Sequence, residues 1–274
     1  MRTEQLAINT VSTARPAFER TLKAYADAGF RRIEFTLPFL KEWLAAGSRT
    51  PQDALELLRE YGLSSCGGFE APVKAFAEPA EQEQNRALLI ANAKLLDALG
   101  GGVMVVGTDG PAKPSLEALE VVGRALRELA QGIPESVSVA LEFNWSPLVK
   151  SVRSAARAVE AAGHSRVGIL FDPAHYHCTS SKFEDLTPAV VARILHVHVD
   201  DMRPKPGELS NCNADRVLPG AGALDLRRIF GRLEEHGYRG WYSLELFNEE
   251  FWKLPVEDAA RQGYESLLRL CERG

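Results

Sequence analysis

Residues 137–171 read VSVALEFNWSPLVKSVRSAARAVEAAGHSRVGILF, and this stretch contains one complete unit of the predicted fold. Apolar and β-branched residues fill Val137–Glu142 and Val167–Phe171, which is typical of buried strands. Between them, Val152–Ala162 spaces its apolar residues as an amphipathic helix does, and Gly163 follows as a helix stop. Two strands joined through a helix pair in parallel, so the stretch predicts a β-α-β unit.

The same alternation extends in both directions and repeats about eight times. Strands are predicted at Gln5–Asn9, Arg32–Phe35, Leu63–Cys66, Val103–Val106, Val137–Glu142, Val167–Phe171, Ile194–Val199 and Trp241–Leu246. Helices are predicted at Ala17–Ala28, Pro51–Tyr61, Asn85–Leu99, Leu116–Leu129, Val152–Ala162, Leu226–His236 and Val256–Cys271, with only a short one within 183–193. No Gly-rich dinucleotide loop follows the first strand, which counts against an open sheet. We predict an α/β fold of the (β/α)8 barrel class, with a single domain over residues 1–274.

Composition excludes several classes of function. The 274 residues carry a formal net charge of −5, whereas nonspecific binding of nucleic acid needs a basic surface. No apolar run approaches the roughly 20 residues of a membrane span. The four cysteines form no CxxC pair, and the N-terminus shows no apolar signal region, so we expect free thiols and a cytoplasmic location.

Good metal ligands stand at or near the ends of the last four predicted strands. The C-terminal strand ends of such a barrel meet at one face, where carboxylates and imidazole would converge. Burying several like charges together is costly unless a cation compensates. Three oxygen donors and one nitrogen donor predict one divalent ion, Mn²⁺ first, with Zn²⁺, Mg²⁺, Co²⁺ or Fe²⁺ as alternatives. The predicted ligands are Glu142, Asp172, His198 and Glu245.

The alternative is that each acid pairs with an arginine or lysine at the barrel mouth. For one acid alone the two interpretations are about equal, but recurrence in four strands favours the metal. Alternation along Ile194–Val199 supports this choice, because it places His196, His198 and Asp200 on one face and Val197 on the other. The deeper His196 is expected to support the site or the core.

Residues after the same strand ends are candidates for substrate contact. Pro173–His177 is expected to be a loop, in which His175 hydrogen-bonds substrate and supplies an acid, while His177 contacts substrate or steadies His175. Core packing or simple hydrogen bonding is the common role of any single histidine.

Three more residues are expected to bind substrate. Arg216 lies in a long loop after the seventh predicted strand, and it would grip a substrate oxygen or neutralise a ligand acid. A surface salt bridge is an equally good interpretation of Arg216. Glu34 in the second strand would contact substrate or support the site, and Trp145 would flank a sugar ring, although packing is the commoner role of a single aromatic residue.

At these residues the chain resembles the xylose-isomerase-like barrel superfamily of sugar isomerases, epimerases and related lyases, and within it the inosose-isomerase branch. The motifs are Ala140–Phe143, Asp172-x-x-His175-x-His177, His198-x-Asp200-Asp201, Asp215–Gly222 and Ser243–Phe247. They cover the C-terminal half well and the N-terminal half only in pattern. The resemblance implies that the four predicted ligands bind the metal, that Glu142 and Glu245 also act as acid and base, and that His175 and Arg216 contact substrate.

We therefore expect a metal-dependent isomerase or epimerase that moves a proton through an enediolate of a keto-inositol or keto-sugar. The same enediolate can expel a β-leaving group, so a lyase (an inosose dehydratase, or an enzyme cleaving a 3-keto-glycoside or C-glycoside) is the alternative. A metal-stabilised sugar-binding barrel is a third interpretation. The expected partner is a small polyhydroxy-ketone, with a homo-oligomer possible and neither nucleic acid nor membrane bound.

Overall fold

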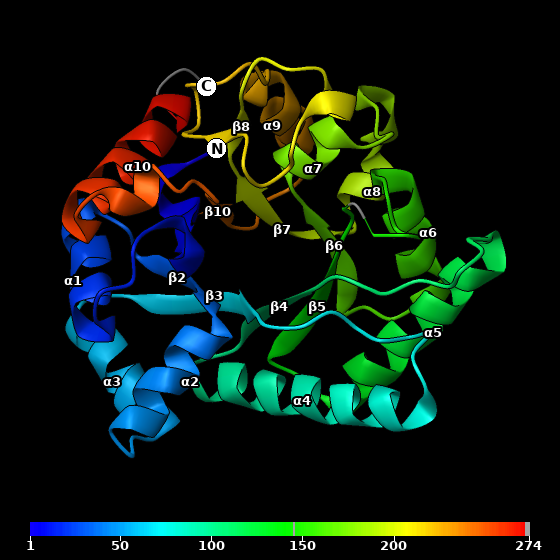
Figure 1. Cartoon of the computed structure of the whole chain (residues 1–274), viewed down its shortest axis with the longest axis horizontal. Helices are drawn as coiled ribbons and strands as arrows, with labels where there is room; N and C mark the ends of the chain where they lie inside the picture. The colour runs from blue at the N-terminus through cyan, green and yellow to red at the C-terminus, as the bar shows by residue number, and fades with distance from the viewer. Residues whose placement is uncertain (145, 272–274) are drawn as a thin grey trace.

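The computed structural model describes residues 1–144 and 146–271, and its eight parallel strands close into a barrel (Figure 1). The barrel order is β1-β10-β7-β6-β5-β4-β3-β2, so the first strand pairs with both the second and the last. These strands are β1 Leu6–Asn9, β2 Arg32–Thr36, β3 Ser64–Phe69, β4 Gly102–Val106, β5 Val137–Glu142, β6 Val167–Phe171, β7 Ile194–Val199 and β10 Tyr242–Leu244. The predicted (β/α)8 class is confirmed.

Helices surround the barrel, as each βα unit requires. They are α1 Phe18–Ala28, α2 Leu37–Ala46, α3 Pro51–Glu60, α4 Pro79–Ala98, α5 Leu116–Gly132, α6 Val152–Ala162, α7 Pro173–Cys178, α8 Pro188–Val191, α9 Leu226–Glu235 and α10 Val256–Cys271. Short 3-10 turns lie at Thr3–Gln5, Thr10–Ser12, Phe183–Asp185, Gly207–Leu209 and Phe251–Lys253. After β7 the chain adds a small antiparallel pair, β8 Asp201–Met202 with β9 Arg216–Val217.

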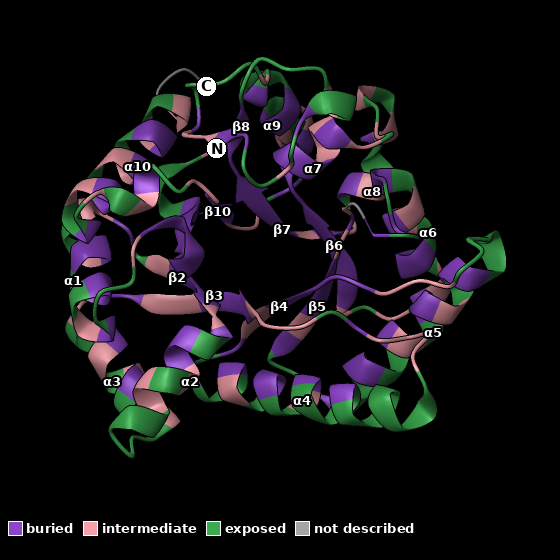
Figure 2. Cartoon of the chain, viewed as in Figure 1, coloured by how far each residue is buried: buried purple, intermediate pink, exposed green. Residues whose placement is uncertain are grey.

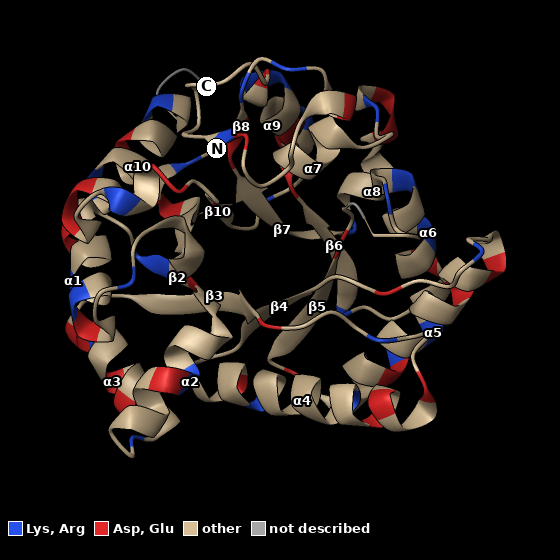
Figure 3. Ribbon diagram, viewed as in Figure 1, with Lys and Arg blue, Asp and Glu red and all other residues tan. Residues whose placement is uncertain are grey.

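Burial follows the layers of the barrel. Figure 2 shows buried residues on the central strands and on the inner faces of the helices, with exposed residues outside. The inward-facing Val105, Ala140 and Leu170 fill the barrel beneath its mouth. Lys, Arg, Asp and Glu are spread over the outer helices with both signs mixed (Figure 3). None of the described helices has the length and apolarity to cross a membrane.

Several predicted boundaries were wrong for identifiable reasons. Strand β3 continues three residues beyond the predicted end at Cys66, through a glycine pair that a strand rarely contains. At Gly67 a Cβ would stand 2.1 Å from the carbonyl oxygen of Val103, so the close approach of β4 requires glycine there. Helix α2 was missed because it follows β2 with no intervening loop, and its first residue cannot be told from a strand continuation.

The region after β6 also differs from the prediction. The segment beginning at Pro173 is the short helix α7 rather than a loop, and Asp172 is its N-cap. Proline is favoured at the first helical position and aspartate at the N-cap, so Asp172 and Pro173 together are a helix-start signal that the prediction overlooked. Strand β10 ends at Leu244, which places Glu245 one residue past the strand.

Candidate metal centre

The four predicted ligands come together at the barrel mouth. Each offers one donor atom, and these atoms all lie within 4.8 Å of one another. Three sit at or just after the ends of β5, β6 and β10, while the fourth comes from within β7. The residues are Glu142, Asp172, His198 and Glu245.

The cluster is organised around the Nδ1 atom of His198. This nitrogen lies 3.1 Å from Glu245 Oε2, 3.5 Å from Asp172 Oδ2 and 3.6 Å from Glu142 Oε1. Asp172 is fully buried and His198 is 1% exposed, so water solvates these groups little. His198 Nδ1 lacks a hydrogen-bond partner among the described residues, and Asp172 Oδ2 forms no hydrogen bond beyond its ion pair with Arg216. A buried polar atom without a partner is rare, and a cation bound here would satisfy His198 Nδ1.

Local backbone structure aims Asp172 at the cluster. Its Oδ1 atom accepts the backbone N–H of His175 at 2.8 Å, which is the N-cap bond of α7. The second oxygen, Oδ2, is thereby directed to the opposite side, toward His198. One carboxylate thus starts a helix and offers a ligand atom.

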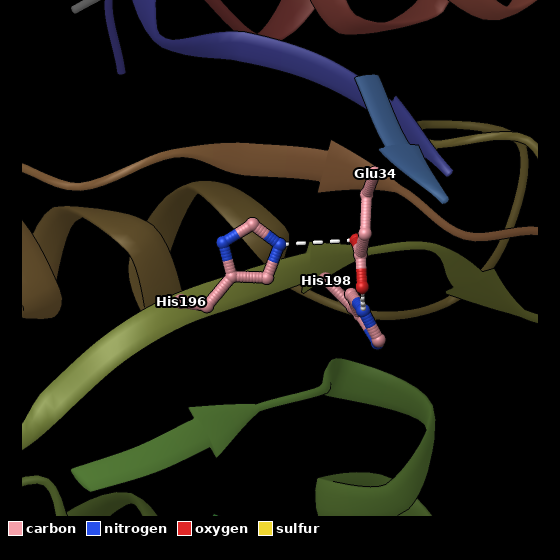
Figure 4. Close-up of side chains that lie close together, drawn as sticks. All are labelled: Glu34, His196 and His198. Atoms are coloured by element: carbon pink, nitrogen blue, oxygen red, sulfur yellow. Dashed lines mark hydrogen bonds and ion pairs between the residues drawn. The ribbon is translucent and has the colours of Figure 1, made fainter. Parts of the chain in front are cut away.

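Glu34 holds the imidazole of His198 from the other side (Figure 4). Its Oε1 lies 3.0 Å from His198 Nε2, and its Oε2 lies 3.0 Å from His196 Nε2. An ionised carboxylate only accepts hydrogen bonds, so both Nε2 atoms carry a proton. Burial lowers the pKa of His198, but Glu245 and Glu34 outweigh burial and raise that pKa well above its usual value. A cation that displaced the proton on Nδ1 would therefore meet a nitrogen lone pair facing the cluster.

Electrostatics supports an ionised Glu34. Burial alone would raise the pKa of this carboxyl, but His198 and His196 outweigh burial and hold the pKa well below its usual value. Because both oxygens are committed to histidines and the side chain is fully buried, the geometry favours the supporting role of Glu34 and gives no support to its predicted contact with substrate.

Arg216 enters the cluster instead of the surface. It is fully buried, which rules out the surface salt bridge considered from sequence. Its Nη1 atom lies 2.9 Å from Glu245 Oε2 and 2.6 Å from Asp200 Oδ2, and its Nη2 atom lies 3.0 Å from Asp172 Oδ2. Arg216 therefore neutralises part of the acidic charge, which matches one of its two predicted roles.

One arginine does not balance this many carboxylates. Burial raises the pKa of Asp200 well above its usual value, and Asp172 and Glu245 add to this effect while Arg216 opposes it. In contrast, Arg216 outweighs the burial of Asp172 and holds the pKa of that carboxyl below its usual value. A divalent cation between Asp172 and Glu245 would offset the like-charge repulsion that these two acids exert on Asp200.

The two histidines of α7 have different surroundings. His175 faces the cluster, with Nε2 3.7 Å from Glu142 Oε1 and 3.4 Å from Arg216 Nη2. Burial lowers the pKa of His175, but Asp172 and Glu142 outweigh it and raise that pKa to about 9. His177 instead lies against the backbone oxygen of Lys205 through Nε2 at 2.9 Å, outside the ligand cluster. Trp145 lies outside the described residues.

Two polar residues at the site were not predicted. Asn9, the last residue of β1, donates from Nδ2 to Glu245 Oε1 at 3.3 Å and so orients that carboxylate. Asp201, which follows β7, is 1% exposed and accepts four backbone N–H groups through its two oxygens. For Asn9, a polar residue at the end of an otherwise apolar strand was the available signal.

Asp201 anchors the loop that follows Arg216. Its Oδ2 accepts from Gly220 and Gly222, each at 3.0 Å, and its Oδ1 accepts from Leu224 at 2.9 Å and Met202 at 2.8 Å. In the adjoining strand pair, Met202 of β8 stands opposite Arg216 of β9. The backbone that carries Arg216 is therefore fixed at both strands of this pair.

Comparison with known proteins agrees with this architecture. The chain is 35% identical over 151 residues to an inosose isomerase of Halalkalibacterium halodurans, a match covering 54% of this chain and 52% of the relative. The chain spans about half the length of the inosose isomerases that it matches. It is also 23% identical over 269 residues to an inosose dehydratase of Clostridium botulinum, covering 89% of this chain and 87% of the relative.

Among solved structures, the crystal structure of IOLI protein with a bound zinc atom superposes with a TM-score of 0.87 and 24% identity, over 97% of each chain. At that identity the likeness speaks for the fold. The family model described as xylose isomerase-like TIM barrel matches residues 22–270. The chain therefore belongs to the xylose isomerase-like TIM barrel family.

Proposed function

We propose that the protein is a divalent-metal-dependent isomerase or epimerase that acts on a keto-inositol or keto-sugar by proton transfer through an enediolate. The observation that carries the proposal is a set of three carboxylates, two of them buried and Glu142 partly buried, around a buried histidine whose Nδ1 atom has no hydrogen-bond partner among the described residues. Hard oxygen donors favour Mn²⁺, with Zn²⁺, Mg²⁺, Co²⁺ or Fe²⁺ as alternatives. The ion would be held by Glu142, Asp172, His198 and Glu245.

A bound divalent ion would supply the positive charge that a ketone oxygen and the developing enediolate require. The two glutamates then divide the proton transfer, since they stand on β5 and just after β10 with His198 between them. Asn9 and Arg216 fix both oxygens of Glu245, whereas Glu142 contacts His175 at 3.7 Å. One glutamate removes the proton next to the carbonyl, and the other returns it.

Elimination is the second candidate reaction. It is favoured by the likeness to an inosose dehydratase over most of the chain, and by His175, whose Nε2 stands beside Glu142 in position to protonate a leaving hydroxyl. The two reactions share proton abstraction and differ in the fate of the enediolate.

Turnover in D2O tests the proposal. Protein stripped with chelator is reloaded with each candidate metal in turn and given a panel of keto-inositols and ketoses, and products are followed by NMR and mass spectrometry. We expect metal-dependent formation of an isomeric product with deuterium next to the carbonyl. A product lighter by one water would establish the lyase instead. No turnover and no deuterium entering any recovered substrate, with metal bound, would contradict both reactions.

A further inference from the structure

A cavity of about 690 Å³ opens at the ends of β1, β2 and β3, outside the set of metal ligands. Helix α2, which sequence patterns did not predict, forms one of its walls. The residues that matter for its chemistry are Arg15, Thr36, Phe39, Glu42, Trp43 and Phe69.

The cavity is connected to the metal centre through the first two strands. Thr36 lies two residues beyond Glu34 in β2, so both side chains point to the same side of the strand, with Thr36 nearer the mouth. Just after β1, the backbone N–H of Val11, which lines the cavity, donates to Asn9 Oδ1, and Asn9 donates in turn to Glu245.

Phe69 makes a third connection. It lines the cavity and also packs against the inward-facing cluster that contains Ala140, two residues before the ligand Glu142. These connections place the cavity at the same face of the barrel as the metal centre.

The cavity lining combines aromatic surface with planar charged groups. Phe39 and Phe69 supply apolar surface, whereas the Trp43 ring stacks on Phe18 and carries the guanidinium of Arg49. Arg15 donates from Nη1 to Thr36 Oγ1 at 3.1 Å, and its guanidinium lies 5.6 Å from the ring centre of Phe39. The described residues include no acidic partner for Arg15, so its remaining donors are available to a ligand.

The acids of the lining balance this charge. Glu42 is exposed and has no ion pair within the described chain, whereas Glu70 is paired with Lys41. A lining with uncommitted groups of both signs matches a neutral ligand better than an anion. Guanidinium and carboxylate groups bind neighbouring hydroxyls, and aromatic faces pack on the C–H face of a polyol ring, so the lining fits a polyol.

We propose that this cavity binds a second polyhydroxylated ring, so that the substrate is a keto-cyclitol or keto-sugar carrying a further sugar-like ring. This inference rests on the proposed function, because the metal centre must hold the ketone-bearing ring. Pockets that enclose drug-sized ligands have volumes on the order of 300–1,000 Å³. The cavity of about 690 Å³ falls within that range and provides room for an added ring.

The test compares three ligands with the Mn²⁺-loaded protein by calorimetry and by turnover. They are a keto-inositol, the same keto-inositol bearing a glucosyl group at each hydroxyl away from the ketone in turn, and the corresponding cyclohexyl ethers. We expect at least one glucosyl compound to bind about tenfold tighter than the keto-inositol, and the cyclohexyl ethers to gain less.

Substitutions locate the effect. Arg15→Ala should reduce the ratio of glucosyl to single-ring kcat/KM by about tenfold, and Glu42→Gln should reduce the same ratio less. Arg20→Ala is the matched control, since Arg20 is an exposed arginine on α1 that pairs with Glu257 and does not line the cavity.

The inference is overturned if no glucosyl compound binds more tightly, if the cyclohexyl ethers gain as much, or if Arg15→Ala leaves the ratio unchanged. Tighter, Arg15-dependent binding of a glucosyl compound without turnover would support the second-ring site and defeat the proposed reaction. Turnover of the single ring without any gain from the second would do the reverse.

Discussion

The two halves of the barrel mouth offer a substrate different chemistry. Strands β5, β6, β7 and β10 bring buried carboxylates and one imidazole within 4.8 Å of each other. Strands β1, β2 and β3 instead border a cavity with aromatic and polar walls. Bond-making groups are concentrated in the C-terminal half, and the N-terminal half provides space and shape.

The halves meet at two residues of the N-terminal strands. Glu34 of β2 holds His198 by its Nε2, and Asn9 of β1 holds Glu245 by its Oε1. The N-terminal half therefore orients ligands without donating any to the cluster. On this division, we expect substitutions in the C-terminal half to change the reaction and substitutions around the cavity to change the substrate range.

The largest effect is expected from the proton-transferring glutamates of the C-terminal half. Glu142→Gln and Glu245→Gln should each lower kcat by about 10²–10⁴-fold, because an amide cannot take a proton from carbon. Both should also abolish deuterium incorporation in D2O. The measurement is steady-state turnover with NMR of the product. If either variant incorporates deuterium as the unmodified chain does, that glutamate is not a base. The proton-transferring groups would then not all lie in the C-terminal half as proposed.

The barrel and the convergence of the four predicted side chains followed from sequence because both depend on local, periodic signals. Apolar runs separated by amphipathic helices give the strands, and a polar residue recurring at strand ends, as at Asp172 and His198, gives the cluster. Because the parallel strands of a barrel all end at one face, these positions come together in one site.

What sequence could not supply depends on side-chain direction and on contacts between distant segments. Arg216 lies in a long loop, and nothing in its neighbours shows that it turns inward to three carboxylates. The second oxygen of Glu34 is bound by His196, some 160 residues away, so this pairing required the closed barrel. The cavity at the ends of β1, β2 and β3 could not be predicted from sequence either, because α2, which forms one of its walls, was not predicted.

An intermediate effect should come from Glu34→Gln, which tests the connection between the halves. The amide can accept from one histidine but turns an N–H toward the other, so the tautomer and orientation of His198 are lost. Substitution of residues that orient metal ligands typically lowers metal affinity 10–100-fold. A competition titration of Mn²⁺ should show a loss in that range.

Glu70→Gln is the control for Glu34→Gln, because Glu70 also borders the mouth but pairs with Lys41 and has no contact with the histidines. Its Mn²⁺ affinity should match that of the unmodified chain. Equal affinity in Glu34→Gln would show that the C-terminal half orients its own ligands, and the connection between the halves would then be structural only.

The smallest effect concerns Asp201, whose role we assign to positioning Arg216. Asp201→Asn replaces one acceptor oxygen by a donor facing two backbone N–H groups, and leaving buried groups unsatisfied costs about 1–3 kcal/mol. Part of that cost should fall on the loop that carries Arg216, lowering kcat/KM by about tenfold.

In a background of Arg216→Ala, the same Asp201→Asn change should lower kcat/KM little further, because residues that act as a unit are not additive. Asp225→Ala provides the comparison, because it removes the side chain that caps α9 through the backbone N–H of Arg228. This variant should lose thermal stability while its kcat/KM stays nearly constant. Fully additive losses in the double variant would mean that Asp201 stabilises the fold without acting through Arg216. The side chains of the C-terminal half would then be positioned by the strands alone, without the loop that Asp201 anchors.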